Sequence, residues 1–133
     1  MTAKYNWGDW ELTDFNHIIQ IFTESQEKMG TDELETIKWM VRYGRDITVD
    51  SLKRLISFLT IGRYDNFEYE EHKLAILEHI VERFAHDTPT EDSLESIKKI
   101  SDYLGNNKKT SCSPQSYARL YFCLAQYYLS VAE

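Results

Sequence analysis

Regularly spaced histidines are the first group in this sequence that could perform chemistry. His72, His79 and His86 recur every seven residues. On a helix that rises 1.5 Å per residue, neighbours in this row lie about 10.5 Å apart, too far for two ligands of one zinc ion with bonds of ~2.1 Å. The spacing therefore predicts a row along one helix face and no metal site. The row is either a solvated face or a partner-facing surface whose binding depends on pH.

The motifs of common enzyme classes do not occur in the sequence. Its five glycines form no phosphate-binding loop, and it has no His-Glu-x-x-His, Glu-x-x-His or Gly-x-Ser-x-Gly pattern. Cys112 and Cys123 lack a Cys-x-x-Cys spacing, which favours buried or idle thiols over redox or metal-binding ones. We therefore expect a protein that is not an enzyme and uses no metal or cofactor.

Acidic side chains are concentrated in one quarter of the chain. Residues 64–95 contain ten carboxylates and two basic residues, a net charge of −8, whereas the rest of the chain has a net charge of +1. Acids in the first turn of a helix complement its dipole, which accounts for residues such as Glu68 and Glu91. Glu78 and Glu82 do not fit that account. Both fall beside the histidine row, and together they predict an acidic face on one helix.

Tyrosines alternate with carboxylates directly before this face, in the run from Tyr64 to Glu71. Tyrosine is enriched at interface hot spots, and acidic side chains steer a basic partner toward its site. A second, compatible interpretation is that Phe67 or Tyr69 staples a helix start to the core while the acids stay in water. The residues predicted to contact a partner are Tyr64, Asp65, Glu68, Tyr69, Glu70, Glu71, His72, Glu78, His79 and Glu82.

Six helices are predicted to position these side chains. The residues that end them are Gly30, Gly44, Gly62, the segment 86–89 and Gly105. Apolar residues recur at helical spacing between these breaks, and no stretch alternates with a period of two. The side chains expected to cap helix starts are Thr13 or Asp14, Thr31, Asp50, Asp65 or Asn66, Thr90 and Ser113. With 133 residues, 42% of them hydrophobic, the chain is predicted to be all-α, with one helical domain over residues 1–133.

A weak internal similarity bears on how the helices are arranged. Residues 48–52, Thr-Val-Asp-Ser-Leu, resemble residues 90–94, Thr-Glu-Asp-Ser-Leu, 42 positions later. That interval matches the ~40 to 47 residues of HEAT-type repeats, although capped amphipathic helices also resemble one another. The predicted architecture is therefore about six antiparallel helices, as stacked hairpins in a short HEAT-like solenoid or closed as an irregular bundle.

The sixth predicted helix, from Pro114 to about Val131, is the most apolar. Its polar residues fall on one narrow stripe, which predicts a central packing element. The alternative is that its tyrosines form the seam of a homodimer.

The overall charge limits the kind of partner. A net charge of −7 disfavours nucleic acid and anionic membranes, which attract basic surfaces, and favours a protein with a basic surface.

The N-terminus has neither the apolar core nor the cleavage site of a secretory signal. The longest apolar run, residues 120–125, is far shorter than the ~20 residues of a membrane span. These features predict a cytoplasmic protein.

The middle third of the chain resembles a known family. The stretch from Leu52 through Asp65, Glu70 and Glu71, then residues 74–82 and the helix at Leu94, resembles all-helical, HEAT-like immunity proteins of bacterial contact-dependent and polymorphic toxin systems. The likeness is a pattern of helices and acids. It implies a protein without catalytic residues that occludes its cognate toxin, often a basic nuclease. The alternatives are a phage anti-defence protein or nucleic-acid mimic that inhibits a host nuclease complex, and a helical-repeat scaffold.

Overall fold

The computed structural model describes residues 14–24, 30–44, 46–60, 67–106 and 114–132, except for the side chains of Phe67 and Glu68. Within these residues the chain forms helices and no strands, which confirms the all-α prediction. The helices are α1 (Phe15–Glu24), α2 (Thr31–Tyr43), α3 (Val49–Leu59), α4 (Phe67–His86), α5 (Glu91–Asn106) and α6 (Pro114–Ala132). No helix in this part of the chain combines the length and apolar character needed to cross a bilayer.

Side-chain caps determine where several helices begin. Asp14, one of the two alternatives for α1, and Thr90 of α5 are caps, because each side chain accepts hydrogen bonds from backbone N–H groups two or three residues later. The predicted cap Thr31 is wrong, because Gly30 occupies the cap position of α2 and makes no side-chain hydrogen bond. At α3 the prediction is wrong by two residues. Thr48 is the cap, and its hydroxyl accepts the N–H of Ser51 at 3.2 Å. Asp50 instead lies in the first turn of α3, where its charge complements the helix dipole.

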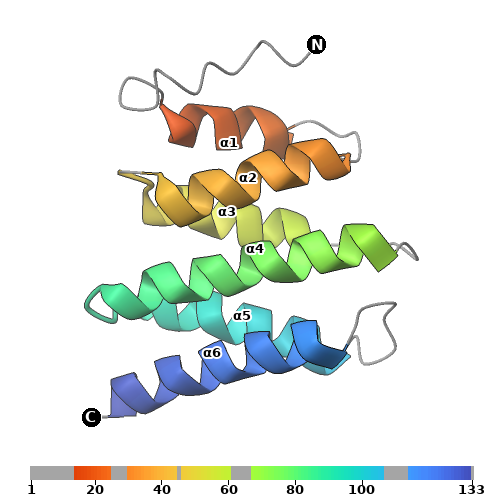
Figure 1. Ribbon diagram of the computed structural model, residues 1–133. Helices are drawn as coiled ribbons and strands as arrows, with labels where there is room; N and C mark the ends of the chain where they lie inside the picture. Colours follow the sequence, from red (N-terminus) through yellow and green to blue (C-terminus); the bar gives the residue numbers. More distant parts are fainter. Residues whose placement is uncertain (1–13, 25–29, 45, 61–66, 107–113, 133) are drawn as a thin grey trace.

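The six helices form two layers (Figure 1). α2, α4 and α6 lie side by side in one layer, and α1, α3 and α5 form the other. α4 is the middle helix of its layer, between α2 and α6, and it also contacts α3 and α5. A helix enclosed in this way must be apolar on more than one face, and α4 buries Leu74, Ile76, Leu77, Ile80 and Val81.

One continuous core joins the two layers. Its aliphatic side chains leave water almost completely, and burying each one contributes roughly 1.5 to 3 kcal/mol. The residues without measurable exposure are Ile19, Leu34, Ile37, Val41, Leu55, Ile76, Leu77, Ile80, Val81, Ile97, Ile100, Leu120 and Tyr127. All six helices contribute to this set, so the layers are held together mainly by apolar packing.

Polar contacts tie segments that lie far apart in sequence. Asn16 of α1 accepts hydrogen bonds at its side-chain oxygen from Thr48 N, at 2.9 Å, and from Ser51 Oγ, at 2.7 Å. Arg83 of α4 donates to the backbone oxygens of Val41 and Gly44, each at 2.9 Å. Carbonyls at a helix C-terminus lack partners within the helix. Arg83 therefore completes the end of α2 from a neighbouring helix.

The structure corrects the expected position of α6. This helix lies at the edge of its layer (Figure 1) and packs on α4. Leu120, Leu124 and Tyr127 are buried, and the Tyr127 hydroxyl lies 2.9 Å from Ser93 Oγ of α5. Outside this buried face, α6 exposes four large side chains: Tyr121, Phe122, Tyr128 and Leu129. The Tyr128 hydroxyl also lies 3.3 Å from Ser101 Oγ of α5. The apolar composition of α6 therefore reflects one buried face and one exposed apolar face, and not a central position.

Candidate protein-binding surface

The predicted partner-binding residues divide into three groups according to the positions they occupy. Tyr64 and Asp65 and the side chain of Glu68 lie outside the described residues. Two of the predicted residues lie in the interior. The remaining five lie at the junctions between α4 and the neighbouring helices of its layer.

Tyr69 and Glu70 are interior residues, so their predicted contact with a partner is corrected. Each is 2% exposed. Glu70 Oε2 lies 3.1 Å from Lys73 Nζ, and Lys73 donates to the Tyr103 hydroxyl of α5 at 2.8 Å. Lys73 also lies 5.0 Å from the centre of the Tyr103 ring, within cation–π range. A buried carboxylate is tolerated only when it is paired, and Glu70 pairs with Lys73 one helical turn later.

Glu71 and His72 connect α4 to its neighbours. Glu71 Oε1 accepts a hydrogen bond from Ser116 Oγ of α6 at 2.6 Å. His72 Nδ1 lies 3.5 Å from Glu35 Oε1 of α2. Both side chains are partly buried, with that of His72 22% exposed, and their contacts with Ser116 and Glu35 join α4 to α6 and α2.

The pKa of the Glu35 carboxyl is shifted by neighbours in α2 and by His72 of α4. Burial raises the pKa of Glu35, but hydrogen bonding and charge from Lys38, a hydrogen bond from the Trp39 indole and the charge of His72 outweigh burial, and the pKa is lowered from 4.5. Lys38 Nζ lies 3.2 Å from Glu35 Oε1, and Trp39 Nε1 donates to Glu35 Oε2 at 3.3 Å. The charged form of Glu35 is therefore favoured by the folded structure.

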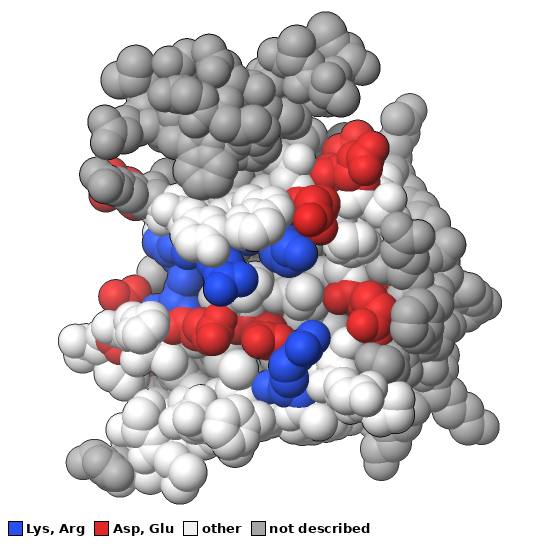
Figure 2. Space-filling view, viewed as in Figure 1, with Lys and Arg blue, Asp and Glu red and all other residues white. Residues whose placement is uncertain are grey.

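The predicted acidic face at Glu78, His79 and Glu82 is partly neutralised within the molecule. Glu78 Oε1 lies 3.5 Å from Arg119 Nε of α6, and His79 Nδ1 lies 3.0 Å from Glu82 Oε1. The side chains of Glu78 and His79 are largely covered, whereas that of Glu82 is 51% exposed. Figure 2 shows acidic and basic side chains interleaved across this layer. Of these three residues, Glu82 is the one most available to a partner.

A group of possible metal-ligand side chains occurs where α4 meets α6. The ligand atoms of Glu78, Glu82 and Cys123 lie within 4.8 Å of one another. Burial raises the pKa of the Cys123 thiol to about 11, with a further contribution from the charges of Glu78 and Glu82. The thiolate is the form that binds metals, so at neutral pH Cys123 offers a poor ligand. Arg119 already neutralises part of this charge.

Other exposed acids lie close together in the sequence, and we call this set the acidic corner. It comprises side chains at the C-terminal end of α4, in the following turn and in the first turns of α5: Glu82, Asp87, Glu91, Asp92 and Glu95, all exposed. The nearby Arg83 is directed to the end of α2. Lys53 of α3 approaches Asp92 at 3.2 Å. Glu95 lines a depression together with Lys98 and Lys99, so the negative charge of the corner is partly offset at its α5 end.

Four members of the acidic corner were not among the predicted site residues. Asp87, Glu91, Asp92 and Glu95 belong to the acidic segment 64–95, but acids near a helix start also complement its dipole. That local explanation does not account for the exposure of all four side chains. The charge count could have identified them, because between positions 82 and 95 Arg83 is the only lysine or arginine in the sequence.

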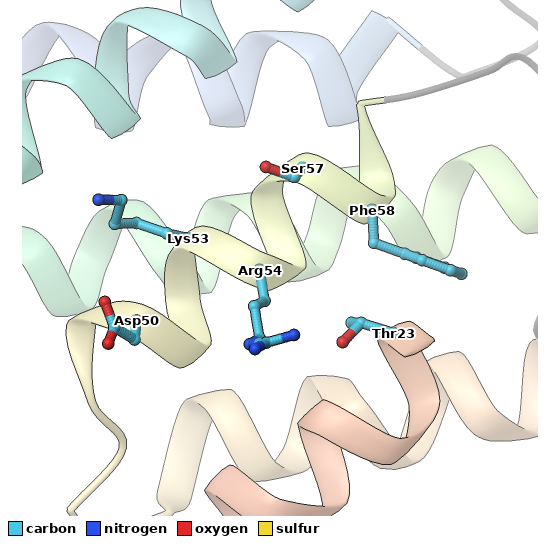
Figure 3. A pocket seen from close by; sticks show the side chains of 6 residues that line it. All are labelled: Thr23, Asp50, Lys53, Arg54, Ser57 and Phe58. Atoms are coloured by element: carbon cyan, nitrogen blue, oxygen red, sulfur yellow. The ribbon is translucent and has the colours of Figure 1, made fainter. Parts of the chain in front are cut away.

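The layer of α1, α3 and α5 carries two adjoining depressions. One has a volume of about 480 Å3 and is lined by Thr23, Asp50, Lys53, Arg54, Ser57 and Phe58. Figure 3 shows Arg54 of α3 and Thr23 of α1 extending toward the space between their helices. The second, of about 420 Å3, lies between α3 and α5 and shares Lys53 and Ser57 with the first. Together they form an open polar groove along α3.

Comparison of the chain with protein-family models, curated proteins and solved structures gives no match.

Proposed function

We propose that this protein binds a basic protein partner through the acidic corner and inhibits it by covering its working surface. The observation that supports this proposal is the exposure of five carboxylates in the last turns of α4, the following turn and the first turns of α5. Among the described residues, Asp92 is paired with Lys53 and Glu82 lies beside His79. Neighbouring surface carboxylates repel one another, and the approach of a cationic surface lowers their electrostatic free energy. The partner that fits is therefore rich in lysine and arginine.

The proposed mechanism is steric occlusion by a preformed helical body. A two-layer stack of helices packed on one core keeps its surface shape on binding, so little conformational entropy is lost in the complex. Rim charges act mainly on the rate of association, because they orient the partner before contact. No bond is made or broken in this function, and it requires no cofactor.

An immunity protein that neutralises a basic toxin, such as a nuclease, is the specific form of this proposal. A nuclease must present basic residues to phosphates, and those residues are complementary to a carboxylate cluster. The resemblance of the middle third of the chain to HEAT-like immunity proteins supports the same form. A two-layer helical stack is also the arrangement that a short HEAT-type solenoid would have.

The test compares two variants of equal net charge. Glu82→Gln/Asp87→Asn/Glu91→Gln removes three charges from the acidic corner. Asp32→Asn/Asp50→Asn/Asp102→Asn removes three exposed charges from other surfaces. The wild-type protein is first used to recover its partner from the native host, and the partner is identified by mass spectrometry. Association rates of the purified partner are then measured at low and high salt.

We expect the corner variant to associate about tenfold more slowly at low salt, with a weaker salt dependence. The control variant should retain the wild-type rate, and the partner's activity should fall to zero at a fixed molar ratio of wild-type protein. Equal rates and equal salt dependence for all three proteins would rule out the acidic corner as the binding surface.

A second candidate function rests on the groove along α3. A helical-repeat scaffold binds an extended peptide in such a groove, and Lys53, Arg54, Lys98 and Lys99 would suit acidic residues of that peptide. In that case the control variant, which changes Asp50 and Asp102 in the groove, would alter binding and the corner variant would not.

A further inference from the structure

The uncovered side of α6 has a regular apolar pattern. Ala118, Phe122, Ala125, Leu129 and Ala132 follow one another at intervals of four, three, four and three residues, the spacing that places side chains along one coiled-coil seam. All five are exposed, with Phe122 at 63% and Leu129 at 67%. We call these five residues the α6 seam. Tyr121, 47% exposed, lies at its side.

The seam lies where a soluble helical stack normally presents polar residues. Terminal helices of such stacks need a polar outer face, because no further helix covers them. α6 is the last helix of its layer (Figure 1), yet its seam contains no charged or hydrogen-bonding side chain. In Figure 2 the edge of the molecule formed by α6 is largely uncharged. Arg119, which does carry a charge, is directed to Glu78 of α4.

We propose that a second copy of this chain covers the seam, with the two α6 helices antiparallel. The large residues Phe122 and Leu129 occupy one set of seam positions, and alanines occupy the other set. Antiparallel helices bring the two sets opposite each other, so every layer pairs a large side chain with an alanine, as close packing requires. Parallel helices would place Phe122 against Phe122 and leave voids between alanines.

Charge also favours a second copy at this face over any other face. Each chain has a net charge of −7, so two copies repel one another wherever acids are exposed. The seam is free of charge, and its contact can form without bringing carboxylates together. Because salt screens the remaining repulsion, dimerisation should strengthen as salt rises, whereas binding at the acidic corner should weaken.

The available area is that of a modest interface. Aromatic side chains bury about 150 to 250 Å2 when fully enclosed. The half-exposed Tyr121 and Phe122, with Leu129 and the alanines, can therefore bury on the order of 500 Å2 per copy. Both copies together reach the ~1,000 Å2 at which specific interfaces begin. The dimer should accordingly dissociate on dilution.

Sedimentation velocity over a roughly hundredfold concentration range tests the dimer, since mass action shifts such an equilibrium. Wild-type protein should move from one to two chain masses, and more completely at high salt. Phe122→Glu/Leu129→Glu should stay at one chain mass with an unchanged circular dichroism spectrum, because both side chains are exposed. The matched control is Val49→Glu/Leu94→Glu, which replaces two exposed apolar residues on α3 and α5 and should dimerise like wild type.

Cross-linking tests the orientation. In a background with Cys112 and Cys123 replaced by serine, Ala118→Cys and Ala132→Cys proteins are treated with a short bismaleimide. Antiparallel pairing separates identical positions by about 15 Å or more along the axis, so neither protein should cross-link alone and their mixture should. Cross-linking of each protein alone would indicate a parallel pair.

Wild-type protein that remains at one chain mass throughout would overturn the dimer, including the case in which a different protein is later found on α6. Dimerisation of Phe122→Glu/Leu129→Glu would show that the chains associate through another surface. The proposal is separable from the proposed function, because the corner variant should dimerise normally.

Discussion

Two carboxylates of α4 show how position decides the role of a charged residue. Glu70 is enclosed with Lys73 and Tyr103 and is 2% exposed. Glu82, three turns later, is 51% exposed beside His79. A buried charge must satisfy its partners inside the protein, and it cannot meet another molecule. Glu70 therefore belongs to the internal packing of α4 on α5, and Glu82 belongs to the surface.

Replacing one member of the buried pair should be far more costly than replacing both. Lys73→Met leaves Glu70 as an uncompensated charge and should lower the free energy of unfolding by about 3 to 5 kcal/mol. Glu70→Leu/Lys73→Met removes both charges and should recover most of that loss. Urea unfolding measures all three proteins. A double variant as unstable as Lys73→Met would show that the pair is not coupled.

At the scale of elements, α4 is held on both sides by polar contacts as well as by apolar packing. On the α2 side these are His72 with Glu35 and Arg83 with the end of α2. On the α6 side they are the Glu71–Ser116 hydrogen bond and the Glu78–Arg119 pair. Three residues predicted to face a partner, Glu71, His72 and Glu78, instead contact these two neighbours.

Glu35 should make stability depend on pH, mainly through its contacts with Lys38 and Trp39 within α2 and to a smaller extent through His72 of α4. Its pKa is lowered from 4.5 in the folded protein. The stabilisation is therefore present above the unfolded pKa and is lost as pH falls through the lower folded value. Glu35→Gln should reduce the free energy of unfolding by less than about 1 kcal/mol at pH 6, since the pair is partly exposed, and the difference should shrink toward pH 3.

Chemical denaturation at both pH values measures this difference. Glu95→Gln, which makes the same change on the exposed surface of α5, is the control. A gap between wild type and Glu35→Gln that widens as pH falls would contradict the favourable surroundings of this carboxylate.

At the scale of the whole molecule, the stack has a protected middle and two exposed sides. α4 contacts α2, α3, α5 and α6, whereas the described contacts of α6 are mainly with α4 and those of α1 mainly with α3. Local opening costs least where few apolar contacts hold an element. The surfaces proposed for binding, the acidic corner and the α6 seam, thus lie around a rigid centre.

Hydrogen exchange should follow this order. Backbone amides of residues 74–84 in α4 should exchange most slowly, and those of α1 and of the solvent side of α6 should exchange faster. The measurement is exchange followed by mass spectrometry at a protein concentration low enough to keep the chain monomeric. At high concentration, α6 should gain protection if the proposed dimer forms. Equal protection of α1, α4 and α6 in the monomer would contradict a stack with one protected middle helix.

Local interactions made the helices predictable from the sequence. Caps such as Asp14 and Thr90, glycines between helices and the 3.6-residue apolar period act over a few residues, so the all-α class and the helix positions could be predicted. The excess of negative charge in residues 64–95 is also read directly from the sequence. The sequence by itself thus determined the helices and the excess of acid in that segment.

Only the tertiary structure decided which of these acids meets water. The partners that cover Glu70, Glu71 and Glu78 are Tyr103, Ser116 and Arg119, all 33 to 45 residues away in the chain, and no pattern within one helix reveals them. The same holds for α6, whose apolar residues divide between a buried face and an uncovered seam. Exposure is set by which helices become neighbours, because burial depends on contacts that close long loops of chain.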